Sequence, residues 1–173
     1  WGPFVGKVNL QGGLITSRDG RGVPIYERYF LGGITDIRGF DIQSIGPYIG
    51  IAGTFDDPLF QTVRARGEQF GGNLQLYYNM EIEFPIIESV GIKGVLFHDA
   101  GNAWNLEKSL CGPAPADRDP AIQPCSTDIT RLRTSWGFGF RWFSPLGPLR
   151  FEWGFPFNPR RPYEDTYEFQ FNV

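Results

Sequence analysis

The sequence predicts an all-β protein, and more specifically an antiparallel transmembrane β-barrel. Apolar and polar residues alternate along several segments of about ten residues, as they do in strands whose successive side chains point to opposite faces. The 173 residues include 23 Gly and 14 Pro, and 16% are aromatic, a composition that favours strands joined by turns. No apolar run approaches the roughly 18 residues that predict a membrane-spanning helix.

About six strands are predicted along the chain. The first lies within "GPFVGKVNLQGGLIT" near the start, and "NLQLYYNMEIEF" at residues 73–84 has apolar side chains at its even positions and mostly polar ones at its odd positions. The remaining strands are predicted at residues 91–104, 131–143, 149–157 and 167–173.

The predicted connections differ in length. Long loops span about residues 17–71 and 105–130, whereas short turns are predicted after Pro85 and at "SPLGP", residues 144–148. Long loops on one side and short turns on the other are typical of an outer-membrane barrel. About six strands fall short of the roughly eight in the smallest closed barrels, so we expect a piece of a longer protein with two open sheet edges.

The two faces of the strands differ in chemistry. In "RLRTSWGFGFRWF" bulky apolar residues alternate with Arg, Ser and Gly, and "LRFEWGFPF" shows the same split. A transmembrane barrel turns its apolar face to lipid and its polar face to the lumen, with Trp136, Trp142 and Trp153 suited to the lipid-facing surface and its interfacial girdles. A soluble β-sandwich with an apolar core remains the alternative at this point.

Charge and cysteine content restrict the setting. The net charge is −3, and Lys and Arg form no run, so the electrostatic signature of nucleic-acid binding is missing. Cys111 and Cys125 enclose a Pro-rich and Asp-rich segment, which predicts a disulfide in an oxidising compartment. Two free thiols are the alternative.

Five segments, in this order, resemble the BamA-type outer-membrane assembly factors and their relatives in two-partner secretion, TamA and organelles. They are "GGITDIRGFD", "IEFP", "FHDAGNAW", "GFGFRWFSPLGPLRFEWGFPF" and "YEFQFNV". The resemblance implies that residues 1–173 are the C-terminal part of a barrel of about 16 strands in the outer membrane of a Gram-negative bacterium. The POTRA repeats of that family are missing from this chain, and its last strand usually runs further than Val173.

The resemblance also implies that the loop around Arg38, Gly39 and Phe40 enters the barrel and meets acids on the inner wall. Glu83 and Asp99 are the expected partners, and Glu81, on the same strand face as Glu83, ranks below it. A guanidinium suits this role because it binds a carboxylate through two parallel hydrogen bonds. The glycines at positions 32, 33 and 39 would allow tight turns. From the residues alone, an exposed arginine in a flexible turn is the alternative.

The function implied by the resemblance is the assembly and insertion of β-barrel proteins, through strand addition at a weak seam beside the closing strand with Tyr167, Phe169 and Phe171. Unfolded outer-membrane clients, lipids and accessory lipoproteins bound through the POTRA repeats are the expected partners, and no cofactor is predicted. A two-partner secretion or TamA-like polypeptide transporter is the alternative, because it shares the loop motif.

An outer-membrane hydrolase is a third hypothesis, and the sequence argues against it. His98 and Asp99 are adjacent, so their side chains point to opposite faces of a strand, and motifs of the G-x-S-x-G or H-E-x-x-H type do not occur. Asp56 and Asp57 lack the spaced ligands of a calcium loop. No catalytic residue and no metal site are therefore predicted.

Overall fold

The computed structural model describes residues 3–18, 22–49, 68–107, 129–145, 147–159 and 164–173. One six-stranded sheet dominates it, with strands in the order β1-β4-β5-β6-β7-β8 and antiparallel pairing throughout. Its strands are β1 (Val5–Leu14), β4 (Leu74–Ile87), β5 (Ile92–Trp104), β6 (Arg133–Ser144), β7 (Gly147–Pro156) and β8 (Glu168–Asn172). The prediction of an antiparallel all-β fold with about six strands is confirmed, while the total of about 16 strands stays a prediction.

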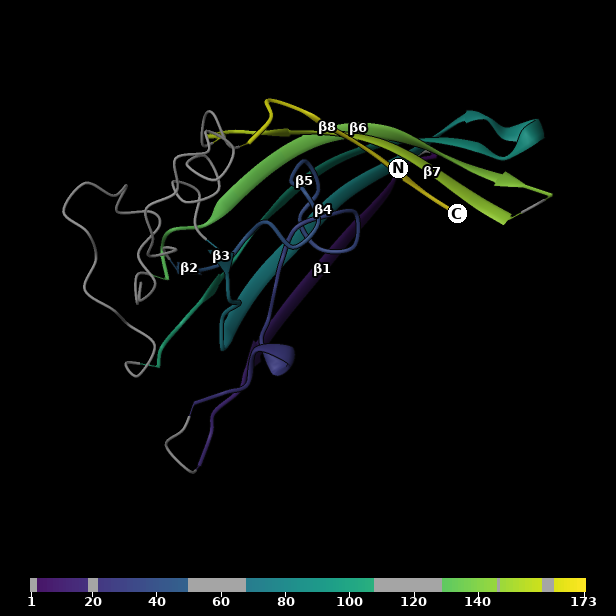
Figure 1. The fold of residues 1–173 in the computed structure, drawn as a ribbon. Coiled ribbons are helices and arrows are strands. Elements are labelled where there is room, and N and C mark those ends of the chain that lie inside the picture. Colours follow the sequence, from purple (N-terminus) through teal and green to yellow (C-terminus); the bar gives the residue numbers. More distant parts are fainter. Residues whose placement is uncertain (1–2, 19–21, 50–67, 108–128, 146, 160–163) are drawn as a thin grey trace.

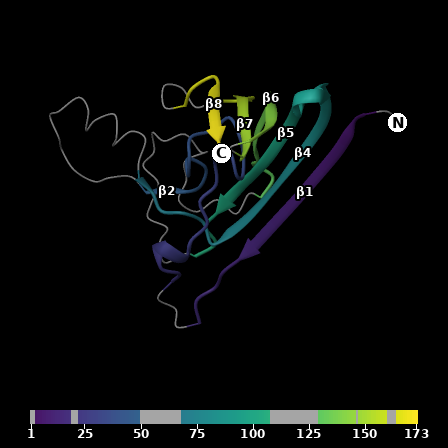
Figure 2. The ribbon, with the colours of Figure 1, turned by 90° about the vertical axis from the view of Figure 1, so that its right-hand side faces the viewer.

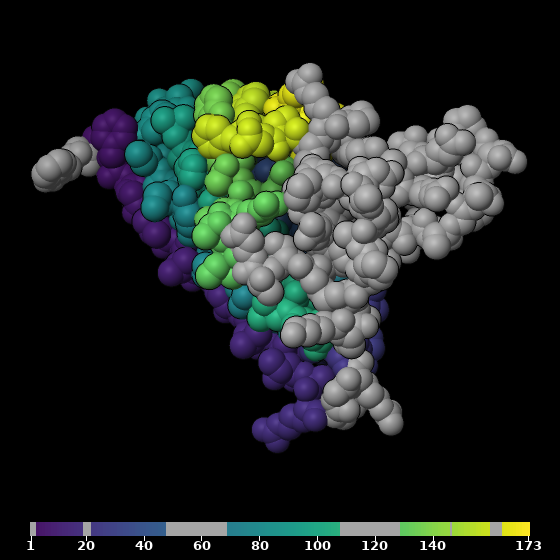
Figure 3. All heavy atoms as spheres, turned by 90° about the vertical axis from the view of Figure 1, so that its left-hand side faces the viewer, coloured from purple at the N-terminus to yellow at the C-terminus, as the bar shows by residue number. Residues whose placement is uncertain are grey.

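The sheet curves like a segment of a barrel wall (Figure 1), and its strands lie side by side from β1 to β8 (Figure 2). In the space-filling view, purple β1 and the yellow C-terminal segment lie at opposite sides, with teal and green strands between them (Figure 3). Among the described strands, β1 pairs only with β4 and β8 pairs only with β7. The described part of the chain therefore forms an open sheet with an edge at each end.

Burial on this sheet is the reverse of that in a soluble protein. Large apolar side chains of the predicted lipid face are exposed, among them Met80, Ile82, Trp136, Phe138 and Phe140. Polar and charged side chains of the other face are buried, namely Glu83, Asp99, Ser135 and Glu152. This arrangement suits a wall with lipid outside and a polar lumen inside, and it argues against the β-sandwich.

The turn between β4 and β5 differs in detail from the prediction. Strand β4 continues through Pro85 to Ile87, with a register irregularity between these two residues. A proline is tolerated at such a bulge, where a ladder hydrogen bond is already missing. The short helical turn η2 (Glu88–Val90) then leads to Gly91 in the left-handed conformation, and β5 follows.

We call the long segment between β1 and β4 the RGF loop. Its described part around residues 31–45 is folded against the concave side of the sheet (Figure 1). The loop contains the helical turn η1 (Ile25–Glu27) and a two-stranded sheet of β2 (Tyr48–Ile49) with β3 (Glu68–Gln69). Its apolar side chains form a small core with two residues of the sheet; this core comprises Leu31, Ile37, Phe40, Ile45, Tyr77 and Ala103. Apolar contact therefore holds the loop against the inner wall.

Helices contribute little to this fold. The two helical turns are three residues long each. Within the described ranges, no helix combines the length and hydropathy that crossing a bilayer requires.

Candidate functional site

Arg38 lies at the tip of the RGF loop and is almost completely buried, with 2% of its surface exposed. Its guanidinium binds the carboxylate of Asp99 through two hydrogen bonds, from Nε to Oδ2 at 2.6 Å and from Nη2 to Oδ1 at 2.7 Å. The backbone N–H of Arg38 also donates to Asp99 Oδ2, at 3.1 Å. Asp99 thus fixes both the side chain and the backbone of the loop at this residue.

Two further acids bind the remaining part of the same guanidinium. Arg38 Nη1 donates to Glu81 Oε1 on β4 at 2.6 Å and to Glu152 Oε2 on β7 at 3.3 Å. The flat face of the guanidinium covers the ring of Phe97, with Cζ 3.7 Å from the ring centroid. Arg38 therefore connects strands β4, β5 and β7 from within the concave face of the sheet.

Strand alternation explains why these acids meet. Phe97 and Asp99 are two residues apart on β5, so both point inward. Glu81 on β4 is paired with Phe97, and Asn79 with Asp99, which brings the Glu81 and Asp99 side chains to neighbouring positions on one face. A loop that inserts here meets carboxylates from two adjacent strands.

A second arginine shares the acids with Arg38. Arg141 on β6 donates to Glu81 at 2.7 and 2.9 Å and to Glu152 at 3.0 Å, and it also binds Glu83. Arg150 pairs with Glu152 as well. We call the whole set the lumenal network; it consists of Lys7, Arg38, Arg141 and Arg150 with Glu81, Glu83, Asp99 and Glu152.

Every carboxylate of the lumenal network lies within ion-pair distance of at least one of its cations. Burial alone would lower the pKa of Arg38, but the hydrogen bond to Asp99 and the charges of Asp99, Glu152 and Glu81 raise it above its usual range. The guanidinium consequently stays charged. The fully buried Asp99 is compensated by this guanidinium, whereas the equally buried Glu152 is also paired with Arg141 and Arg150.

The structure corrects the expected ranking of the two glutamates on β4. Glu83 does not bind Arg38; it binds Lys7 at 2.6 Å and Arg141, and Lys93 lies 4.0 Å away. Glu81 is the residue that reaches Arg38. Residues two apart on a strand are separated by about 7 Å, so Arg38, held by Asp99, contacts the nearer acid and Arg141 binds the farther one.

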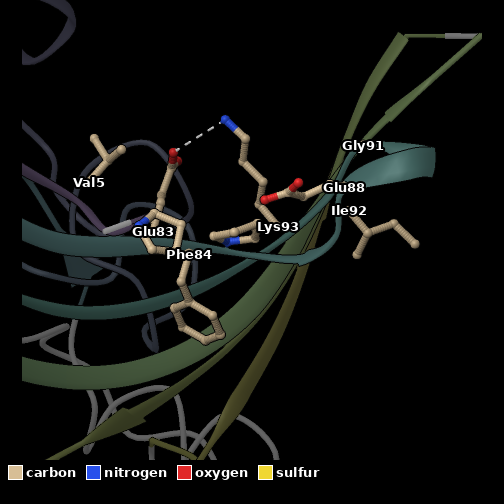
Figure 4. Close-up of a pocket in the computed structure, with 9 residues that line it drawn as sticks. Val5, Glu83, Phe84, Glu88, Gly91, Ile92 and Lys93 are labelled. Carbon is tan, nitrogen blue, oxygen red and sulfur yellow. Dashed lines mark ion pairs between the residues drawn. The ribbon is translucent and has the colours of Figure 1, made fainter. Parts of the chain in front are cut away.

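Glu83 and Lys93 also border a pocket of about 290 Å³ where β4 ends and β5 begins. Figure 4 shows the two side chains pointing toward each other, with their ion pair marked, while Phe84 points away from them. Pro3, Val5 and Pro85 add apolar surface to the lining. This pocket is separate from the Arg38 site, and Glu83 belongs to its rim.

Backbone contact brings the loop tip, Arg38 to Phe40, directly onto the wall. Gly39 has a positive φ of 83°, and a Cβ on the facing Gly154 of β7 would lie 2.4 Å from the Gly39 backbone. Ser135 Oγ on β6 donates to the Arg38 carbonyl, and Gln170 Nε2 on β8 donates to the Phe40 carbonyl at 3.0 Å. Only glycine at both positions allows so close an approach.

A second buried arginine holds the beginning of the RGF loop. Arg28 donates to the Val23 carbonyl at 2.9 Å, to Asn105 Oδ1 at 3.2 Å, and to Glu107. Its guanidinium also lies over the ring of Phe70. We call residues 22–30 the loop root; it is joined by Arg28 to the end of β5.

Several sequence predictions concern other parts of the chain. Phe169 and Phe171 on β8 pack in a tilted arrangement against Trp153 and Phe151 of β7, with centroids 4.9 and 5.0 Å apart, and Tyr167 lies just before β8. These residues line an edge strand, but their role in a seam stays a prediction. The proposed Cys111–Cys125 disulfide and the Asp56–Asp57 pair lie outside the described residues.

His98 and Asp99 contact different partners. Tyr78 Oη lies 3.3 Å from His98 Nδ1 on the outer face, while Asp99 binds Arg38 on the inner one. Within the described ranges, no cluster of His, Cys, Asp and Glu is arranged to hold a metal ion.

Sequence reasoning missed Glu152, Arg141, Ser135 and Gln170 as contacts of this site. All four lie at inward-facing positions of strands in which apolar and polar side chains alternate. This alternation could have identified them as candidates. The register that brings them to the loop tip is a property of the assembled sheet.

The chain is similar in sequence and in fold to known proteins. A model of the Omp85 superfamily domain matches residues 2–173. The chain is 27% identical over 180 aligned residues to the outer membrane protein assembly factor BamA of Neisseria meningitidis, and 29% identical over 164 residues to that of Nitratidesulfovibrio vulgaris. These alignments cover 97% and 94% of the chain but only 20% and 17% of the relatives, so the chain spans about a fifth of their length.

A solved structure agrees with the fold. The crystal structure of Haemophilus ducreyi BamA lacking POTRA domains 1–3 matches with a TM-score of 0.73 and 24% identity, over 96% of the chain and 31% of that protein. This likeness confirms the expected resemblance at the level of the barrel wall.

Proposed function

Because the chain belongs to the Omp85 superfamily, we propose that it is part of a barrel that assembles and inserts other β-barrel proteins into the outer membrane. Its family and its BamA relatives indicate that the chain lies in the outer membrane of a Gram-negative bacterium. The observation that carries the proposal is the loop tip held by Arg38 in the lumenal network, within a chain whose relatives are named assembly factors.

The physical task of such a factor is to keep the backbone of an incoming strand paired. Unpaired N–H and C=O groups are too costly in the hydrocarbon region, whereas an exposed sheet edge offers them partners. Strand β8 lies at an edge of the described sheet, and its exposed Phe169 and Phe171 give it a lipid-compatible face. We assign to this edge the role of a seam at which client strands add.

The Arg38 anchor would serve this process by fixing the wall next to the seam. It connects β4, β5 and β7, which keeps the sheet rigid up to the strand that precedes β8. A rigid wall with one weakly held edge confines opening to that edge. Lipids and accessory lipoproteins are the further partners of this proposal, and it involves no enzymatic reaction.

A depletion strain tests the function. Arg38→Ala and Arg38→Lys are expected to reduce the levels of outer-membrane barrel proteins while the variant itself still reaches the membrane, because lysine cannot replace the bidentate contact with Asp99. Arg18, an exposed residue before the loop root, supplies the control variant Arg18→Ala, which should assemble clients normally.

Two outcomes contradict the proposal. Normal client assembly with both Arg38 variants would remove the anchor from the mechanism. Loss of one secreted polypeptide with unchanged barrel levels during depletion would favour the transporter alternative, a two-partner secretion or TamA-like protein.

A further inference from the structure

We propose that Gln170 is a positioning residue that couples the RGF loop tip to the edge strand β8, so that displacement of β8 and release of the loop tip favour each other. The coupling deepens the proposed function, on which its role in the membrane rests. Its test measures the two segments directly and does not use client assembly.

The contact itself joins residues 130 positions apart in the sequence. Gln170 lies in the middle of β8, opposite Glu152 on β7, and alternation points its side chain inward. There its Nε2 donates to the carbonyl of Phe40 at 3.0 Å. This hydrogen bond joins the edge strand to the loop tip.

Strand β8 is weakly held by its own ladder. It pairs with β7 over five residues, from Arg150↔Asn172 to Gly154↔Glu168, and no described strand covers its other edge. The neighbouring β6–β7 ladder pairs ten residues, from Ser135 to Ser144. A single side-chain bond is therefore a larger addition to the β7–β8 ladder than to the β6–β7 ladder.

The loop tip, in contrast, is firmly fixed on the other side of this contact. Asp99 binds the backbone and side chain of Arg38, Ser135 binds the Arg38 carbonyl, and Gly39 packs on Gly154. The Phe40 carbonyl is thus a preorganised acceptor. Gln170 therefore connects β8, which has a short ladder, to the firmly held loop tip.

The environment of the amide oxygen of Gln170, Oε1, indicates that the hydrogen bond to Phe40 can break at low cost. Oε1 is buried and has no hydrogen-bond partner among the described residues. Turning the amide around would place an oxygen against the Phe40 carbonyl, so the observed orientation is the better one. Displacement of β8 would expose Oε1 to water and offset part of the loss of the Phe40 bond.

Coupling of this kind acts in both directions. If the bond stabilises β8 when the loop tip is seated, it stabilises the seated tip by the same amount when β8 is paired. A client strand that draws β8 away would loosen the loop tip, and a displaced tip would free the edge. Glu152 lies next to both, since it pairs with Gln170 in register and binds Arg38.

Hydrogen–deuterium exchange of the native protein in outer-membrane vesicles tests the coupling, with peptides covering residues 36–42 and 167–173. Gln170→Leu keeps the size of the side chain but removes the donor, and we expect exchange about threefold to tenfold faster in both peptides. Gln170→Lys restores a donor and should return both peptides close to the original rates. Asn172→Leu, on the same face of β8 but paired with Arg150, should leave residues 36–42 unchanged.

Three results would overturn the proposal. Unchanged exchange in both peptides of Gln170→Leu would mean that the bond to the Phe40 carbonyl stabilises neither the loop tip nor β8. Faster exchange in β8 alone would mean that the strand is weakened without coupling to the loop. Equal rates in the Leu and Lys variants would show that the donor is not the cause. None of these results depends on whether clients are assembled, so the proposed function could survive each of them.

Discussion

Arg38 and Arg28 are both buried arginines of the RGF loop, but the wall holds them in different ways. Arg38 at the tip binds three carboxylates on three strands, two of them fully buried. Arg28 at the root binds one carboxylate, that of Glu107, and otherwise carbonyl and amide oxygens. The tip is thus held mainly by ion pairs with buried carboxylates, whereas the root is held largely by neutral hydrogen bonds.

This difference predicts unequal consequences when each arginine is lost. A buried carboxylate without its counter-ion is strongly destabilising, because neither water nor another cation compensates it. Neutral oxygens that lose one donor cost less. Removal of the tip arginine should therefore affect the wall itself, and removal of the root arginine should affect mainly the local loop.

The largest effect is expected for Arg38→Met, which keeps an unbranched apolar stem and removes the charged guanidinium. Asp99 and Glu152 would remain buried with fewer partners, and the free energy of unfolding should fall by about 3–5 kcal/mol, measured by urea unfolding in detergent micelles. Arg38→Met combined with Asp99→Leu should recover much of this loss, because the double variant buries no unpaired charge at Asp99. A double variant as unstable as the sum of both single variants would contradict this explanation.

An intermediate effect is expected for Arg28→Met. It removes one donor from the Val23 and Gly71 carbonyls and from Asn105, whose Oδ1 still accepts from the Glu107 backbone N–H, and Glu107, whose side chain is 15% exposed, can turn toward water. We expect a loss of about 1–3 kcal/mol, with faster amide exchange in residues 22–30 and unchanged exchange at residues 36–42. Faster exchange at the tip would show that root and tip form one cooperative unit and would contradict the expected difference between the two arginines.

The sequence predicted that Arg38 at the loop tip binds Asp99, but it did not predict the contacts of Arg28 at the loop root. The reason for this difference is physical. The Arg38 motif, the inward-facing Asp99 and the strand alternation are all local features, and so is the division into an apolar and a polar face. Arg28 has no motif, and its partners Asn105 and Glu107 follow a strand 77 and 79 residues away in sequence. Such a contact depends on how the loop folds back, which no local pattern encodes.

The choice between Glu81 and Glu83 shows the same limit within a single strand. Both residues are odd-numbered on β4, so alternation places both on the inner face. What separates them is the pairing of Glu81 with Phe97 and of Glu83 with Val95, together with the position of Arg141 on β6. Register between strands far apart in the sequence was therefore the missing information.

The smallest effect is expected for Glu83→Gln, and it is the sharpest test of that register. Glu83 binds Lys7, whose side chain is 49% exposed, and Arg141, which keeps Glu81 and Glu152 as partners. The cations that lose Glu83 are therefore not stranded, and the loss should stay below about 1 kcal/mol, with unchanged exchange at residues 36–42. Glu81→Gln, the matched substitution two residues earlier, should speed exchange at the loop tip because it weakens Arg38 directly. If the two variants changed the loop tip equally, Arg141 would be relaying the loss of Glu83 to Arg38 through Glu81, and the anchor would extend over the whole lumenal network.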